Sequence, residues 1–143
     1  MIRMPRAIAQ EIIAHCQRLY PKEACGLLAA ALPPPAGQAA QVVAAYAMRN
    51  VEDSPIGYAM DPLEQLRMER QMRASRQRLL GIYHSHTASE AYPSPVDVRL
   101  AISPDISYVL VSLADRAHPV LNSYRIDGDR ILPEEAIIDD GHG

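Results

Sequence analysis

Two histidines and an aspartate with metal-ligand chemistry lie in one short segment, GIYHSHTASEAYPSPVD, from Gly81 to Asp97. Side chains alternate faces along a strand, so His84 and His86 would share one face with Cα atoms about 7 Å apart. Their ring nitrogens could then converge on one ion at about 2.0–2.1 Å, the usual zinc–imidazole distance. Such a pair is more often satisfied by backbone carbonyls, so the two histidines alone do not establish a metal site.

Asp97 has a structural explanation as well as a chemical one. The letters SPVD place Ser94 at a helix N-cap, Pro95 at the first helical position and Asp97 at the third, a capping-box arrangement. Such a cap contributes about 1 kcal/mol without any metal. The two roles are compatible, because a carboxylate in the first turn can keep one oxygen free. The residues alone leave both readings open.

Two histidines and one carboxylate suit zinc, with a fourth position open for water, and this arrangement is what metal-assisted hydrolysis requires. A separate carboxylate should take the proton of that water and later deliver it to the leaving amine. By residue type the candidates include Glu11, Glu23 and Glu90. Glu23 directly precedes the apolar run ACGLL, although a solvated strand flank is an equally simple reading of its place.

The surrounding pattern predicts helices interspersed with strands. Apolar spacing indicates a helix over 5–19 and a hairpin of two strands, ACGLLAAAL and QVVAAYAM, joined by PPPAGQ. Helix-start signals precede a helix over 61–78 and a short one from Ser94. Further predicted strands are LLGIYHSH, ISYVLVSL, and the pair VLNSYRI and RILP around the turn DGD. Residues 133–143 are expected to form a flexible tail.

Two of these elements carry specific expectations. In LLGIYHSH, simple alternation places Leu80 and Ile82 on the same face as the two histidines. In the helix from Asp61, a capping box with Glu64 is expected, and Leu63, Leu66 and Met72 should supply the buried side. That helix also carries Arg67, Arg70 and Arg73 at spacings of three, which is either a solvated face or a docking patch for an acidic protein.

Composition restricts the class of protein. The 143 residues are 48% hydrophobic and 22% charged, as expected for a globular protein. With helices interspersed among the strands, the chain is expected to form one domain of mixed α/β (α+β) class spanning 1–143. A formal charge of −3 argues against nucleic-acid binding. No run approaches the roughly 18 apolar residues of a membrane span. The two cysteines, Cys16 and Cys25, lie in apolar patterns and favour the reducing cytoplasm.

At this point the chain resembles a known family. HSH, seven intervening residues and SPVD reproduce the His-x-His-x7-Ser-x2-Asp signature of the JAMM (MPN-plus) zinc metallopeptidases. YPKEACGLL is similar to the upstream glutamate motif of that family, and YAMDP and LLGIYHSH resemble its short bacterial members. The resemblance covers about residues 5–127 and implies a curved mixed sheet flanked by helices, a fold like that of cytidine deaminases.

The resemblance also implies roles. His84, His86 and Asp97 would bind one catalytic Zn²⁺ per chain, Glu23 would act as general base and then general acid, and Ser94 would donate a hydrogen bond to the oxyanion. The implied reaction is hydrolysis of the amide bond after the C-terminal Gly-Gly of a ubiquitin-like sulfur-carrier protein. It would release cysteine or trim the carrier tail.

Some alternatives remain open at the level of sequence. Many family members have proline after the second histidine, where this chain has Thr87, and this leaves the shape of the adjoining groove undetermined. A catalytically silent MPN-type scaffold and a cysteine enzyme using Cys25 are rival readings, although a thiol in an apolar run is usually inert. His15, His118 and His142 are interpreted as surface or helix residues. A homodimer is an open alternative to a monomer.

Overall fold

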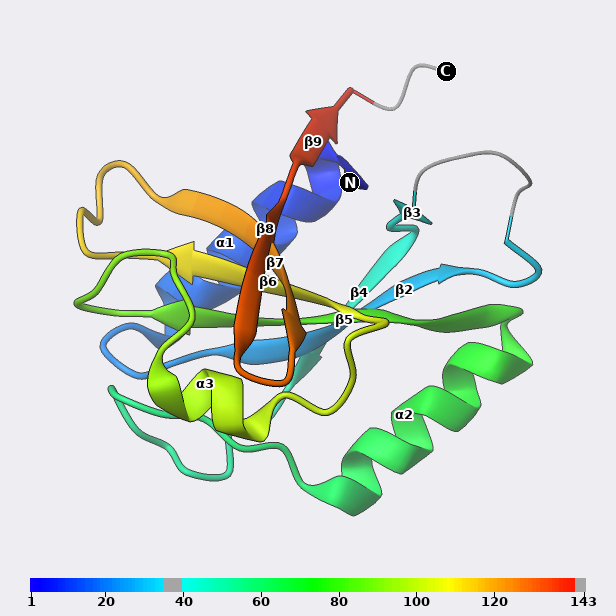
Figure 1. Cartoon of the computed structure of the whole chain (residues 1–143), viewed down its shortest axis with the longest axis horizontal. Coiled ribbons are helices and arrows are strands. Elements are labelled where there is room, and N and C mark those ends of the chain that lie inside the picture. Colours follow the sequence, from blue (N-terminus) through cyan, green and yellow to red (C-terminus); the bar gives the residue numbers. More distant parts are fainter. Residues whose placement is uncertain (35–39, 141–143) are drawn as a thin grey trace.

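A six-stranded mixed sheet forms the centre of the protein in a computed structural model, which describes residues 1–34 and 40–140 (Figure 1). The strands lie in the order β4-β2-β5-β6-β7-β8. Their bounds are β2 Cys25–Ala31, β4 Ala44–Met48, β5 Gln77–His86, β6 Ser107–Ser112, β7 Val120–Asp127 and β8 Arg130–Glu134. Only the β5–β6 pairing is parallel within this sheet, and the predicted hairpins β2–β4 and β7–β8 are confirmed.

Helices cover both faces of this sheet. In Figure 1, α1 (Arg6–Leu19) lies above the central strands, and α2 (Pro62–Ala74) and α3 (Pro95–Leu100) lie below them. Ile12 and Cys16 of α1 are fully buried against Leu28 and Tyr83 on one face. On the other face Met72 of α2 is buried in a second cluster. The predicted α/β class is confirmed.

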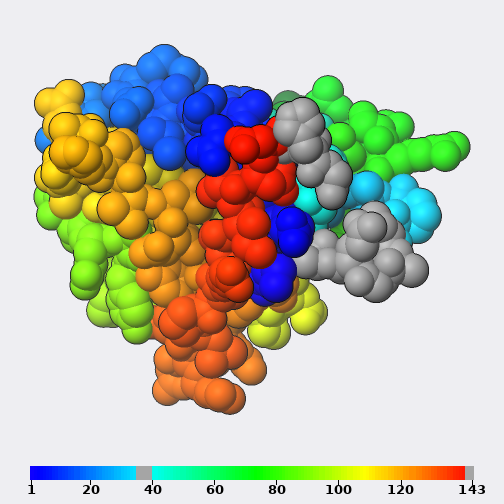
Figure 2. Space-filling model, turned by 90° about the horizontal axis from the view of Figure 1, so that it is seen from above, coloured from blue at the N-terminus to red at the C-terminus, as the bar shows by residue number. Residues whose placement is uncertain are grey.

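A second, three-stranded sheet was not expected from the sequence. It consists of β1 (Ile2–Pro5), flanked in parallel by β3 (Ala40–Gln41) and β9 (Ala136–Asp139). Figure 2 shows the two ends of the described chain side by side. Ala136 and Ile138 pack against the α1-side core, and Arg6 pairs with Asp140 at 2.7 Å.

The predicted flexible tail over 133–143 is therefore wrong for residues 133–134 and 136–139, which belong to β8 and β9. Alternate apolar residues in AIID can pack inward only when β1 supplies a partner strand, a pairing across the whole chain that local patterns do not reveal. Residues 141–143, with His142, and residues 35–38 of the predicted PPPAGQ loop lie outside the described residues.

In α2 the predicted N-cap at Asp61 is confirmed, but the predicted capping box with Glu64 and most of the predicted buried side are wrong. Asp61 accepts hydrogen bonds from the amides of residues 63 and 64, while the carboxylate of Glu64 accepts from Arg49 at 2.9 Å. Met72 is buried, but Leu63 and Leu66 are 54% and 47% exposed. The helix touches the sheet through a narrow stripe, because Met68 and Met72, one turn apart, already fill the contact.

None of the helices among the described residues is long and apolar enough to cross a membrane.

Candidate metal centre

A β-bulge in β5 sets the face on which the two histidines lie. Gly81 pairs with Leu28 and Leu79 pairs with Ala29, so Leu80 is the extra residue between them. Leu80 consequently joins the α1-side core, whereas Ile82 packs in the α2-side cluster. The prediction that Leu80 shares the histidine face is wrong for this reason, since a bulge resets the alternation of a strand.

His84 and His86 lie at the C-terminal end of β5 with their side chains on the same face, and both are buried, at 2% and 6% exposure. Their Nε2 atoms are 3.3 Å apart. The parallel neighbour β6 pairs with β5 as far as His86, so the histidines lie where the sheet still holds the strand firmly. The predicted convergence of the two rings is confirmed.

Asp97 is brought to these rings by the start of α3. The Ser94 hydroxyl accepts a hydrogen bond from the Asp97 amide at 3.1 Å, and the Ser94 amide donates to Asp97 Oδ2 at 2.8 Å. This is the predicted capping box. The same carboxylate lies 3.2 Å from His84 Nε2 through Oδ1 and 3.1 Å from His86 Nε2 through Oδ2. The helix cap thus also places Asp97 as a candidate metal ligand.

The donor set fits a metal ion of the zinc type. The ligand atoms of His84, His86 and Asp97 all lie within 4.8 Å of one another. The Nδ1 atom of His86 lies 2.9 Å from the Glu90 carbonyl, an acceptor that would hold the Nδ1 proton while Nε2 binds a metal at the centre. Two imidazole nitrogens and a carboxylate face one another here, and all three can act as electron-pair donors. One cation at the centre would bind all three groups.

The charges of the site follow from the same contacts. Burial alone would raise the pKa of Asp97, but hydrogen bonds from His84 and His86 hold it well below its usual range. Burial lowers the pKa of His84. Burial also opposes the charged form of His86, but its bonds to Asp97 and to the Glu90 carbonyl raise its pKa overall. The centre therefore holds a carboxylate charge that favours a cation.

Of the glutamates considered from sequence, only Glu23 reaches this centre. It precedes β2, where Cys25 pairs with His84, and its side chain is buried at 6% exposure. Burial raises its pKa to about 7; His86 lowers it, while Asp97 and Glu52 raise it. Glu11 is exposed on α1, and Glu90 contributes its backbone carbonyl. A carboxyl with this pKa can exchange a proton near neutral pH.

The backbone beside Glu23 is held firmly to β5. The Ala24 amide donates to the Ser85 hydroxyl at 2.8 Å, and the Ser85 amide donates to the Ala24 carbonyl at 3.0 Å. Ser85 is the residue between the two histidines and is fully buried. The general-base candidate and the ligand pair are therefore joined through a single residue.

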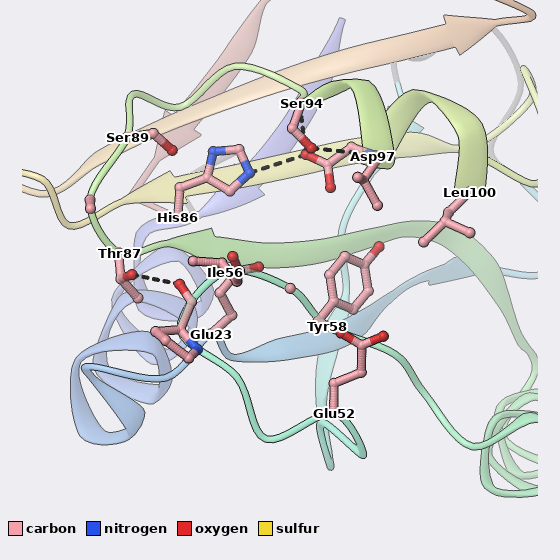
Figure 3. Close-up of a pocket in the computed structure, with 14 residues that line it drawn as sticks. Glu23, Glu52, Ile56, Tyr58, His86, Thr87, Ser89, Ser94, Asp97 and Leu100 are labelled. Carbon is pink, nitrogen blue, oxygen red and sulfur yellow. Dashed lines mark hydrogen bonds and ion pairs between the residues drawn. The ribbon is translucent and has the colours of Figure 1, made fainter.

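An open cavity of about 370 Å³ adjoins these residues (Figure 3). Glu23, His86, Ser94 and Asp97 line its polar side. The rest of the lining is Glu52, Pro55, Ile56, Gly57, Tyr58, Thr87, Ala88, Ser89, Val96 and Leu100. The loop that carries Ile56 and Tyr58 closes one side, and α3 closes the other. A substrate could reach the histidine–aspartate centre and Glu23 from the same opening.

Two features of the site were not anticipated from the sequence. The ring of Tyr58 stacks on His84 with centroids 4.3 Å apart and planes 27° apart. The side chain of Asn50 forms hydrogen bonds with the backbone of Gly57 and Ala59, on either side of Tyr58. A tyrosine and an asparagine in a stretch without periodicity give no local signal of these contacts. The motif YAMDP marks the position of Tyr58 but not its role.

The remaining thiols and histidines lie outside this chemistry. Cys16 and Cys25 are free and buried, and burial raises the pKa of both thiols to about 12, which disfavours the thiolate needed by a cysteine enzyme. His118 is exposed beside Asp115. His15 lies in α1, as a helix residue, and is buried with its Nδ1 atom 2.7 Å from the Tyr83 hydroxyl.

A small α/β domain with a histidine–aspartate centre beside a buried glutamate is the arrangement of JAB/MPN domains. The sequence profile described as prokaryotic homologs of the JAB domain matches residues 5–127, and the chain belongs to this family.

The sequence is also similar to bacterial proteins named as peptidases or proteases. The CysO-cysteine peptidase of Mycobacterium tuberculosis is 44% identical over 127 residues, which is 89% of this chain and 84% of that protein. The probable TtuB-protein conjugate cleaving protease of Thermus thermophilus is 34% identical over 102 residues, covering 71% of this chain and 64% of that protein.

Solved structures agree on the fold. A protein of Desulfitobacterium hafniense solved in solution superposes with a TM-score of 0.87 at 38% identity, covering 98% of this chain and 94% of that one. A JAB1/MPN domain protein from Archaeoglobus fulgidus superposes with a TM-score of 0.57 at 15% identity, covering 94% and 98%. The second likeness extends the fold to a distant member.

Proposed function

We propose that this protein is a zinc-dependent peptidase of the JAMM type. It would hydrolyse the amide bond after the C-terminal Gly-Gly of a ubiquitin-like sulfur-carrier protein. The observation that carries the proposal is the convergence of His84, His86 and Asp97 within 4.8 Å, beside the buried Glu23 and open to one cavity. The names of the mycobacterial and Thermus relatives support the reaction and the kind of substrate.

His84, His86 and Asp97 would hold the zinc ion. Bound zinc would lower the pKa of a water molecule toward about 7 and polarise the scissile carbonyl. The hydrogen bonds of His86 to Glu90 and of Asp97 to Ser94 keep the ligands oriented. Both contacts come from groups of this chain, so the fold itself orients the side chains that would bind zinc.

Glu23 is proposed to move the proton. Its pKa of about 7 allows the carboxylate to take a proton from the attacking water near neutral pH, and the resulting acid can then protonate the leaving amine. Burial keeps the carboxyl away from bulk water, and the bonds through Ser85 and Ala24 fix the backbone next to it. Both steps use the same carboxyl oxygens facing the cavity.

Ser94 is proposed as the donor to the developing oxyanion. Its hydroxyl oxygen accepts from the Asp97 amide, so its own proton remains available to the cavity that it lines. A well-placed donor of this kind contributes about 3–4 kcal/mol to the transition state. The cap of α3 therefore fixes the ligand Asp97 and the donor Ser94 together.

The carrier tail is proposed to enter between the loop of Ile56 and Tyr58 and helix α3. Val96 and Leu100 are exposed along that helix and provide apolar contact for an extended chain. A diglycine end is the narrowest peptide and could approach the centre closely. The free, buried cysteines are consistent with the cytoplasm as the place of action.

The test uses protein purified without chelators. Zinc content would be measured directly, and cleavage of a ubiquitin-like carrier ending in Gly-Gly-Cys would be followed by mass spectrometry. We expect one zinc per chain, release of cysteine, and loss of both on His84→Ala. Glu23→Gln should retain zinc and lose turnover, whereas the matched change Glu52→Gln, at the cavity wall, should retain both. A folded wild-type protein without zinc or turnover would instead support the silent scaffold.

A further inference from the structure

The two histidines of the candidate metal centre are held by different means. The Nδ1 atom of His86 has a carbonyl partner at Glu90. The Nδ1 atom of His84 is buried and has no hydrogen-bond partner among the described residues. What His84 has instead is the face of Tyr58, stacked at 4.3 Å with the ring planes 27° apart.

This difference matters for a ligand. Histidines that bind metals usually donate their other ring nitrogen to an acceptor, which fixes the plane of the ring and the tautomer. A buried N–H without an acceptor is unfavourable, and it leaves the Nδ1 side of the ring without a polar restraint. The Nε2 side of His84 faces Asp97, so on the Nδ1 side the restraint comes from packing, and the Tyr58 ring is the stacked aromatic neighbour.

The position of Tyr58 is in turn set by a single side chain. The amide of Asn50 makes four hydrogen bonds, all of 3.0 Å, within its own loop and to the base of the site. It donates to the carbonyls of Glu23 and Gly57, and it accepts from the amides of Glu52 and Ala59. Tyr58 lies between two of these bonded residues, so its backbone is fixed on both sides.

The loop is also attached at two other points. The Glu23 amide donates to the Ser54 carbonyl at 2.8 Å, and the Thr87 hydroxyl donates to the Pro55 carbonyl at 2.9 Å. Asn50 therefore connects the segment of the general base with the aromatic ring that covers His84. In Figure 3 Tyr58 lies on the loop that faces Asp97 and Leu100 across the cavity.

We propose that Tyr58 is the positioning residue of the ligand His84, and that Asn50 acts through it by fixing the loop. The inference rests on the proposed function, because it concerns the metal affinity of the same site. Stacking of the aromatic face takes the place of the missing hydrogen bond, so the ring of Tyr58 matters and its hydroxyl does not.

Metal affinity gives a readout that does not depend on turnover. Zinc dissociation would be measured by competition with a chromophoric chelator, and ligand geometry by the visible absorption of the Co²⁺-substituted protein. We expect Tyr58→Ala to weaken zinc binding at least about tenfold and to alter the Co²⁺ spectrum, as loss of an outer-shell partner does. Tyr58→Phe should bind zinc as the wild type does.

Asn50→Ala should reproduce the Tyr58→Ala effect, and the double variant should be no weaker than either single one, because both act through one ring. Tyr46→Ala is the matched control: its ring packs against the same core cluster, but it bonds Gln77 and lines no part of the cavity. If Tyr58→Ala unfolds, Tyr58→Leu keeps much of the volume without the aromatic face.

Wild-type zinc affinity and an unchanged Co²⁺ spectrum in folded Tyr58→Ala or Tyr58→Leu would overturn the inference. Equal loss in Tyr58→Phe would overturn it as well, by assigning the effect to the hydroxyl. Failure of the wild-type protein to bind zinc would remove the proposed function and this inference together. A zinc-binding wild type with unaffected Tyr58 variants would remove only the inference.

Discussion

The hydroxyl of Thr87 donates a hydrogen bond to the backbone carbonyl of Pro55 at 2.9 Å. Thr87 directly follows the second histidine, and Pro55 belongs to the loop that carries Ile56 and Tyr58 into the cavity wall. Proline, which many JAMM members have at this position, could not donate this bond. Thr87, where the family pattern has proline, therefore links the segment after β5 to the Pro55 loop, and both segments line the cavity.

Thr87→Val should remove the hydrogen bond to Pro55 while leaving His84, His86 and Asp97 in place. We expect KM for the carrier tail to rise a few-fold with kcat nearly unchanged, and stability to fall by about 0.5–1.5 kcal/mol, the net value of one hydrogen bond. Thr87→Ser, which keeps the donor, should restore KM. A fall in kcat with constant KM would place Thr87 in the chemistry instead.

Ser94 is predicted to have two separable effects. Ser94→Ala removes the cap and should lower the free energy of unfolding by about 1 kcal/mol. It also removes the proposed oxyanion donor and should reduce kcat by about 10²–10³-fold. Ser94→Thr retains both functions and should recover most of each. Chemical denaturation and steady-state kinetics measure the two effects, and loss of stability without loss of kcat would exclude the donor role.

Much of this site could be predicted from sequence because its parts are local. The alternation of a strand gives the convergence of His84 and His86, and helix-start chemistry gives the placement of Asp97 by Ser94. Both patterns span fewer than about five residues, so each depends on one element only. The role of Glu23 needed the family resemblance, and the order of the strands was not predicted.

What could not be predicted depends on contacts between distant segments. Leu80 changes face because of a bulge against β2, and β9 forms because β1 is available at the other end of the chain. The loop from Asn50 has no periodicity, and its bonds to Glu23 and Gly57 appear only once β2 and β5 are paired. Local propensity carries no information on such partners.

Gly26 is predicted to be intolerant of any side chain. A Cβ at this position would overlap the ring of Tyr83, which lies on the neighbouring strand and bonds His15. Gly26→Ala should therefore destabilise the protein by about 1–3 kcal/mol, as overpacking does. The measurement is denaturant unfolding, with Tyr83→Leu added to relieve the overlap. If the second change gives no recovery, the clash with Tyr83 is not the cause.

Glu23 is predicted to make the metal-free protein less stable as pH rises. Burial raises its pKa from the unfolded value of 4.5 to about 7, so the folded state binds more protons than the unfolded state between these values. Since stability falls with pH wherever the folded state binds more protons, the free energy of unfolding should decrease from about pH 4.5 to 7 and then level off.

Burial gives the direction of this effect, and the charged groups around Glu23 modify its size. Asp97 and Glu52 disfavour its ionisation and His86 favours it, while burial is the largest cause. Glu23→Gln removes the titration. In EDTA-treated protein, the free energy of unfolding of the variant minus that of the wild type should therefore be about 1–3 kcal/mol larger at pH 8 than at pH 5. Urea unfolding at both pH values measures this difference. An equal difference at pH 5 and pH 8 would mean that Glu23 ionises normally and that the cavity does not desolvate it.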